Sequence, residues 1–252
     1  MPKPTLLMVH GLAGSLDYFD PAGRIAHARV ETLDLLGYGV FRDAAQDRLT
    51  LQSQAEHVAS RAASLSDGPL WLLGHSMGGA VVMLMADQRP ELVTGIINVE
   101  GNFTLKDAFW SSRIIARPLA EWSRQYRAMQ QDIHKCAADW GIEPSEKRIE
   151  CVTSILEHQP AATIYAMSKA LIEETCVPAY LDAVRRVVER GVPIHLIAGE
   201  RSAKDWDIPD FVRSAARSYT EIAHAGHLMM LEEPDAFCRT VDSILPSVHG
   251  AS

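Results

Sequence analysis

One serine and one histidine, far apart in the chain, lie in sequence contexts that suit nucleophilic catalysis. Ser76 lies in the stretch GHSMGG, which begins at Gly74, and His227 lies in the stretch GHLMMLEEP near the carboxyl end. A serine hydroxyl is a weak nucleophile at neutral pH, so it needs a base within hydrogen-bonding reach. His227 is the first candidate for this base, and His224 is the alternative. The pair predicts a reaction in which Ser76 attacks a carbonyl group and His227 carries the proton.

The sequence around Ser76 predicts a sharp turn between a strand and a helix. The apolar run Leu70–Leu73 is typical of a buried parallel strand, and Ala80–Ala86 is typical of a helix. Such a turn forces its middle residue to a positive φ and leaves little room for neighbouring side chains, which Gly74 and Gly78 satisfy. This is the G-x-S-x-G pattern of a nucleophile elbow. The alternative is a glycine-rich turn with an incidental serine.

Length and composition favour one α/β domain with an inserted segment. The chain has 252 residues, 47% of them hydrophobic, and a formal net charge of -8, so it can bury a large core and is not expected to bind nucleic acid. Four cysteines without metal-like spacing predict reduced thiols and a cytoplasmic protein. The first apolar run is too short for a signal peptide or a membrane span. We expect a small-molecule substrate, no metal, no cofactor, no membrane association, and a monomer or homodimer.

Apolar strand-like runs alternate with helical stretches, which is the pattern of a mostly parallel sheet covered by helices on both faces. Between Asn102 and about Val177 the sequence predicts several helices and no strand, as in a lid. The predicted fold class is α/β, with about six strands, a core formed by 1–101 and 178–252, and a helical lid (cap) at 102–177. The expected strands are Thr5–Val9, Val30–Asp34, Leu70–Leu73, Thr94–Val99, Pro193–Ala198 and Tyr219–Ile222. The expected helices outside the lid are Tyr18–Ala26, Leu51–Leu65, Met77–Gln88, Ala179–Arg190, Pro209–Ala216 and Pro234–Leu245.

Three further segments resemble motifs of the α/β-hydrolase superfamily, and the chain is most similar to its serine esterases and lipases. HGLAGS, from His10, resembles the oxyanion segment, and DLLGYG, from Asp34, resembles the D-x-x-G-x-G turn. GHLMMLEEP, from Gly226, resembles the loop of the catalytic histidine. The motifs follow the family's order along the chain, which is more specific than any single motif. Because only nine residues precede His10, the resemblance implies a sheet trimmed at its amino-terminal side.

The acid that should accompany the histidine departs from the family's usual pattern. The resemblance places an aspartate after the penultimate strand, where this chain has Ser202. A neutral hydroxyl cannot stabilise an imidazolium as a carboxylate does. Glu100 is the first candidate, since it ends the apolar run GIINVE one strand closer to the elbow, and some family members, including haloalkane dehalogenase-like ones, draw their acid from this strand. Asp205 and Asp207 are the alternatives; Asp207 has a competing role as a helix cap, and Glu100 as a capping or ion-pairing carboxylate.

The resemblance also implies an oxyanion hole, which the backbone amides of Leu12 and Met77 would form. In the predicted lid, Phe103, Trp110 and Met167 are expected to line an apolar substrate pocket above Ser76. Several arginines recur along one stretch of the lid and form either a solvated helix face or a site for a substrate carboxylate. These are Arg113, Arg117, Arg124 and Arg127.

The predicted activity is hydrolysis of a small-to-medium, largely apolar carboxylic ester through an acyl-enzyme intermediate. Thioester, lactone and C–C bond hydrolysis are alternatives, because the same side chains serve all of these reactions. Two other classes of function remain open. One is a non-catalytic ligand receptor on this fold, and the other is a cofactor-free oxygenase that uses the histidine and the acid without a nucleophilic serine.

Overall fold

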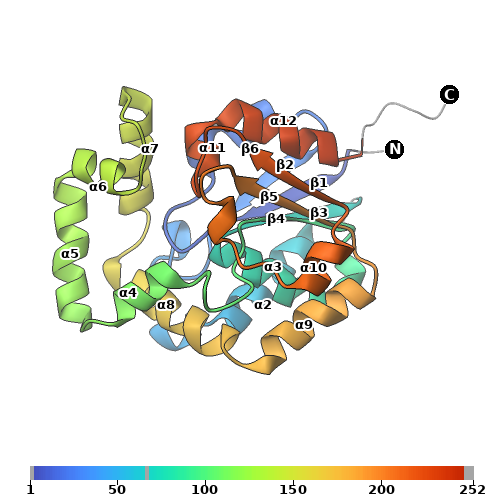
Figure 1. The fold of residues 1–252 in the computed structure, drawn as a ribbon. Helices are drawn as coiled ribbons and strands as arrows, with labels where there is room; N and C mark the ends of the chain where they lie inside the picture. The colour runs from blue at the N-terminus through green and yellow to red at the C-terminus, as the bar shows by residue number, and fades with distance from the viewer. Residues whose placement is uncertain (1–2, 66–67, 247–252) are drawn as a thin grey trace.

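Six parallel strands form a single sheet at the centre of the molecule (Figure 1). The computed structural model describes residues 3–65 and 68–246, so the remaining positions of the expected core lie outside the described residues. The strand order is β2-β1-β3-β4-β5-β6, and every neighbouring pair is parallel. The predicted fold class is therefore confirmed. The strands are β1 (Thr5–Val9), β2 (Arg29–Leu33), β3 (Leu70–His75), β4 (Gly95–Val99), β5 (Ile194–Gly199) and β6 (Ser218–Ile222).

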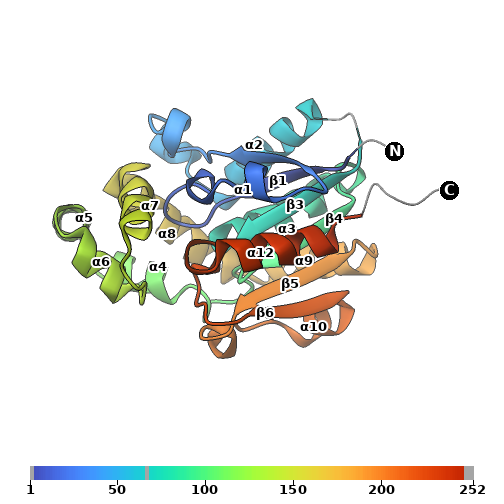
Figure 2. The ribbon, with the colours of Figure 1, turned by 90° about the horizontal axis from the view of Figure 1, so that it is seen from above.

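Helices cover both faces of the sheet, which is why β1, β3 and β4 are buried along their whole length. Along β1, Leu6 and Met8 face the core beneath α1 and α12, whereas Leu7 and Val9 face the core beneath α2, α3 and α9. Figure 2 shows that α1 and α12 lie against one face of the sheet. The covering helices are α1 (Pro21–Arg24), α2 (Leu51–Ser64), α3 (Met77–Gln88), α9 (Pro178–Glu189), α10 (Asp210–Ala215), α11 (Met229–Glu232) and α12 (Pro234–Ile244).

One helix differs from the expectation. In place of a continuous helix over Tyr18–Ala26, the chain forms a 3-10 turn at Asp17–Phe19 and then the short helix α1. Asp20 separates them with a φ of 52°, in the left-handed region, and its carboxylate accepts a hydrogen bond from the Gly23 amide at 3.2 Å. Asp20 therefore ends one turn and caps the next, a local arrangement that competes with a continuous helix.

The segment between β4 and α9 is helical. Helices α5, α6 and α7 extend beyond the carboxyl ends of the strands, whereas α8 packs against α2 and α4 (Figure 1). In the part of the chain that the structure describes, no helix combines the length and apolarity needed to cross a membrane. The helices of this segment are α4 (Phe109–Ile115), α5 (Leu119–Gln131), α6 (Ile133–Asp139), α7 (Glu146–Glu157) and α8 (Ala161–Thr175).

Polar contacts join this helical segment to the sheet domain. The Asp34 carboxylate, after β2, lies 2.7 Å from Nε2 of His158, after α7. The Glu174 carboxylate on α8 accepts hydrogen bonds from the amides of Leu51 and Gln52, at 2.8 and 3.1 Å. Those amides begin α2 and have no partner within the helix, so Glu174 caps α2 from another element. The segment is thereby anchored to the end of β2 and to the start of α2.

Candidate active site

Ser76 occupies the turn between β3 and α3 in a strained conformation. Its φ is 54° and its ψ is -124°, a region that costs a non-glycine residue roughly 1–3 kcal/mol. The flanking glycines explain how the turn is accommodated. A Cβ atom on Gly74 would lie 2.4 Å from the Gly78 carbonyl oxygen, and one on Gly78 would lie 2.4 Å from the Val9 carbonyl oxygen. No side chain fits at either position, so the turn is tight and lies against the end of β1.

Glu100 follows β4 at the same edge of the sheet. Its φ is 41° and its side chain is buried. One carboxylate oxygen, Oε2, lies 2.6 Å from Nδ1 of His227, whereas Oε1 accepts hydrogen bonds from the Gly199 amide at 2.8 Å and the Ser202 hydroxyl at 2.6 Å. Burial raises the pKa of this carboxyl, but the hydrogen bonds from His227, Ser202 and Gly199 together hold it below its ordinary value. Glu100 is therefore an ionised carboxylate beside an imidazole.

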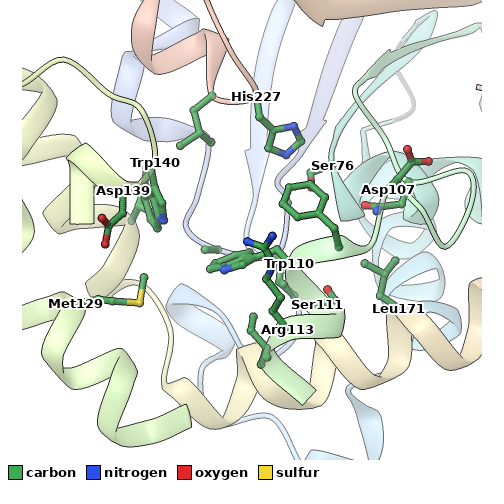
Figure 3. A pocket seen from close by; sticks show the side chains of 18 of the residues that line it. Ser76, Asp107, Trp110, Ser111, Arg113, Met129, Asp139, Trp140, Leu171 and His227 are labelled. Atoms are coloured by element: carbon green, nitrogen blue, oxygen red, sulfur yellow. The ribbon is translucent and has the colours of Figure 1, made fainter. Parts of the chain in front are cut away.

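His227 lies in the loop after β6, where both its ring and its backbone oxygen have a polar partner. Glu100 accepts from Nδ1, which leaves Nε2 as the nitrogen available to a nucleophile. Nε2 of His75 lies 2.9 Å from the backbone oxygen of His227, and since a carbonyl only accepts, His75 donates. The two imidazole rings lie 4.7 Å apart between centroids. Figure 3 shows His227 and Ser76 in one cavity, and both side chains line it.

The alternative residues lie elsewhere. His224 is largely exposed and its nearest acid is Glu200, at 3.9 Å. Asp205 is exposed, on a 3-10 turn after β5. The Asp207 carboxylate accepts hydrogen bonds from the Thr104 hydroxyl at 2.7 Å and the Lys106 ammonium at 3.1 Å, so it joins two loops. Of the three carboxylates that the sequence suggested, only Glu100 contacts His227 among the described residues.

The backbone amides of Leu12 and Met77 have no acceptor within the described residues. Leu12 lines the same cavity as Ser76, and Met77 begins α3. The loop that carries Leu12 lies close to the elbow, because a Cβ on Gly11 would be 3.0 Å from the Cβ of Ser76. Unpaired amides at a helix start and in an adjacent loop suit the binding of developing negative charge.

A cavity of about 480 Å³ opens at Ser76 and His227 and extends beneath the helical segment. Most of its wall is apolar, and the indole of Trp110 contacts those of Trp122 and Trp140 edge to face. Trp110 lines this cavity. The structure places Phe103 and Met167 outside this cavity, fully buried in the core. Phe103 stacks on Trp206, and the Met167 sulfur accepts from Gln54, so both pack between elements.

Some polar residues of the cavity were not singled out from the sequence. Asn102 is buried, and its Oδ1 has no partner among the described residues. Such a buried polar atom is usually hydrogen-bonded to a water molecule or a ligand.

Of the four arginines that recur along the predicted lid, Arg113 and Arg117 line the cavity whereas Arg124 and Arg127 do not. No acidic side chain pairs with Arg113 in the described structure, and Figure 3 shows its side chain reaching into the cavity from α4.

His10 fixes the loop that carries Leu12. Its Nδ1 donates to the Gly11 carbonyl at 2.8 Å, and its Nε2 accepts from the Leu35 amide at 3.1 Å, so the ring is neutral with the proton on Nδ1. Burial lowers the pKa of His10 from 6.5 to about 4. Between these pH values the unfolded chain binds a proton that the folded chain does not, so stability falls as the pH drops through 6.5 and levels off below about 4.

We expect this histidine to contribute to the loss of stability in acid. Between pH 7 and pH 5 its share is at most about 2 kcal/mol, since one pKa unit corresponds to about 1.4 kcal/mol. His10→Asn should therefore be less stable than wild type at pH 7 but lose less stability on going to pH 5, as measured by urea unfolding. His134→Asn, at an exposed position on α6, is the control. Equal losses for His10→Asn and wild type would contradict the prediction.

Comparison with known proteins supplies independent information about this chain. Residues 6–240 match the model of the alpha/beta hydrolase family. The chain is 28% identical to a 2-succinyl-6-hydroxy-2,4-cyclohexadiene-1-carboxylate synthase of Klebsiella pneumoniae, over 97% of this chain and 94% of that protein. It is 28% identical to a pimeloyl-(acyl-carrier protein) methyl ester esterase of Sodalis glossinidius, over 94% and 91%. A thermophilic esterase from Thermogutta terrifontis superposes with a TM-score of 0.71 at 19% identity, over 97% and 89%.

Proposed function

The chain belongs to the alpha/beta hydrolase family, and on this premise we propose that it is a serine hydrolase of small-to-medium, largely apolar carboxylic esters. The observation that carries the proposal is the 2.6 Å contact between Glu100 and Nδ1 of His227, at the edge of the sheet where Ser76 forms the elbow. A carboxylate in this position holds the imidazole in one tautomer and stabilises its protonated form.

In the proposed reaction, Oγ of Ser76 attacks the ester carbonyl carbon while Nε2 of His227 accepts the hydroxyl proton. The tetrahedral oxyanion receives hydrogen bonds from the amides of Leu12 and Met77. It collapses by breaking the bond to the alcohol oxygen, and the alcohol leaves with the proton from His227. A water molecule, deprotonated by His227, then attacks the acyl carbon. The bond from this carbon to Oγ of Ser76 breaks, His227 returns its proton to Oγ, and the carboxylic acid leaves. Glu100 stays ionised throughout.

The helical segment fits the role of a lid in this proposal. Helices α4 to α8 supply most of the apolar wall of the cavity, including Trp110 and Trp122. A largely apolar wall favours an apolar acyl or alcohol group. We therefore assign 102–177 as the lid and 1–101 with 178–252 as the core.

Aryl esters of increasing acyl length test the proposed activity directly. We expect turnover that rises and then falls with acyl length as the cavity fills, whereas binding without turnover would indicate a receptor.

Arg113 favours a second, narrower substrate class, in which the acyl chain ends in a carboxylate. Its guanidinium lies in a cavity whose wall is mostly apolar, and although Asp107 and Asp139 also line that cavity, no acidic side chain pairs with Arg113 in the described structure. The names of the two relatives refer to carboxylate or pimeloyl compounds. A charge-assisted hydrogen bond between an arginine and a carboxylate is worth roughly 1.5–3 kcal/mol when shielded, and less at an exposed position such as this one.

We expect Arg113→Gln to raise KM about threefold for an aryl monoester of a dicarboxylic acid and by less than about 1.5-fold for the matching uncharged ester, since a hydrogen bond to a charged group is worth less at this exposed position than at a shielded one. Arg124→Gln is the matched control, because Arg124 lies on α5 outside the cavity. Steady-state kinetics on the two esters gives the result. An equal effect on both esters, or an equal effect of both substitutions, would argue against a carboxylate site at Arg113.

A further inference from the structure

Ser202 follows β5 at the place where the sequence led us to expect an acid, and it is hydrogen-bonded to the carboxylate that contacts His227. Its hydroxyl oxygen lies 2.6 Å from Oε1 of Glu100. A carboxylate only accepts, so Ser202 donates its single hydroxyl proton there. The Gly199 carbonyl, the other acceptor nearby, lies at 3.3 Å and is uncharged. The short contact to the ionised oxygen is the stronger of the two hydrogen bonds.

The Glu100 side chain depends on few contacts for its orientation. Its backbone is in the left-handed region, and its carboxylate is buried with three donors: Nδ1 of His227 on Oε2, and the Gly199 amide and the Ser202 hydroxyl on Oε1. The Gly199 amide is fixed by β5, so Ser202 is the side chain that restrains the second oxygen. His75 is the other titratable group beside this pair, and its own contact is to the His227 backbone.

We propose that Ser202 is a positioning residue that holds the Glu100 carboxylate against His227, and that a carboxylate introduced at 202 can replace the one at 100. This inference rests on the proposed function. The side chain at 202 already reaches within 2.6 Å of Oε1, which belongs to the same carboxylate that contacts Nδ1 of His227. When residue 100 is alanine, an aspartate at 202 can therefore place its carboxylate near Nδ1 of His227.

The first test separates positioning from a structural role. We expect Ser202→Ala to lower kcat for an aryl ester about tenfold or more with little change in KM, because a hydrogen bond to a charged group is lost. Ser202→Thr keeps the hydroxyl and should stay within about threefold of wild type. Ser243→Ala is the control, because Ser243 lies at an exposed position on α12. A kcat of Ser202→Ala equal to wild type, or a Ser202→Thr as slow as Ser202→Ala, would overturn the positioning role.

The second test moves the carboxylate. Glu100→Ala should lose most of its activity, and the double variant with Ser202→Asp should have a kcat at least about tenfold higher than Glu100→Ala alone. If the double variant is no faster than Glu100→Ala, a carboxylate at 202 cannot replace the one at 100. Failure of the underlying function has a different signature. If Glu100→Ala retains wild-type activity, the assignment of Glu100 itself fails, whereas loss in Glu100→Ala together with full activity in Ser202→Ala removes only Ser202.

Discussion

Ser76→Ala is expected to lower kcat/KM for an aryl ester by at least about 10⁴-fold. Without the hydroxyl no acyl-enzyme can form, and the amides of Leu12 and Met77 can only accelerate direct attack by water, which leaves a small residual rate. Alanine tolerates the strained backbone of this turn no worse than serine does. The variant should therefore fold and bind substrate.

A second serine in the same cavity provides the control for this substitution. Ser111 is buried on α4 and lines the cavity, but it does not occupy the turn between β3 and α3. Ser111→Ala should change kcat/KM by less than about tenfold. If Ser76→Ala retains a substantial part of the activity, or if Ser111→Ala loses as much, the nucleophile has been assigned to the wrong residue. Hydrolysis of the ester by Ser76→Ala would favour direct attack by a water molecule with His227 as the base.

Glu100→Gln is expected to lower kcat by about 10² to 10⁴-fold, as the loss of a triad carboxylate does elsewhere. The amide has the shape of the carboxylate but no charge, and only its oxygen can accept, so its NH₂ group must face either Nδ1 of His227 or the donors on the other side, the Gly199 amide and the Ser202 hydroxyl. The imidazolium then forms without a stabilising negative charge. KM should change much less, because Glu100 lies behind the imidazole and does not line the cavity.

Asp205→Asn is the matched control for the charge change, since Asp205 follows the neighbouring strand but is exposed. Its kcat should remain within about twofold of wild type. Steady-state kinetics of the two variants on one aryl ester decides between the two carboxylates. A large loss in Asp205→Asn with an active Glu100→Gln would require a rearranged loop after β5 and would remove Glu100 from the mechanism.

The strands and the turn at Ser76 could be predicted because their sequence patterns depend on local burial and backbone geometry. Apolar runs such as Leu70–Leu73 need only a covered sheet, and the glycines beside Ser76 need only a tight turn. The helix near Tyr18 was predicted as one piece because its periodicity says nothing about Asp20, whose side chain caps the following turn.

The choice of acid and the lining of the cavity depend on how distant segments meet. Glu100 and Asp205 both follow strands at the same edge, and only the path of each loop determines which carboxylate faces His227. In the same way, Trp110 and Phe103 are both large and apolar, but one faces the cavity and the other stacks on Trp206. Composition cannot separate a residue that packs from one that lines a cavity.

Covalent labelling with a fluorophosphonate tests most directly whether Ser76, His227 and Glu100 act together. The reagent reacts with a serine only where a base and an oxyanion site activate it. We expect the label on Ser76, located by peptide mass spectrometry, with a labelling rate that falls by at least about 10²-fold in Glu100→Gln and is unchanged in Asp205→Asn. A label on another residue, no label at all, or equal rates in wild type and Glu100→Gln would contradict this mechanism.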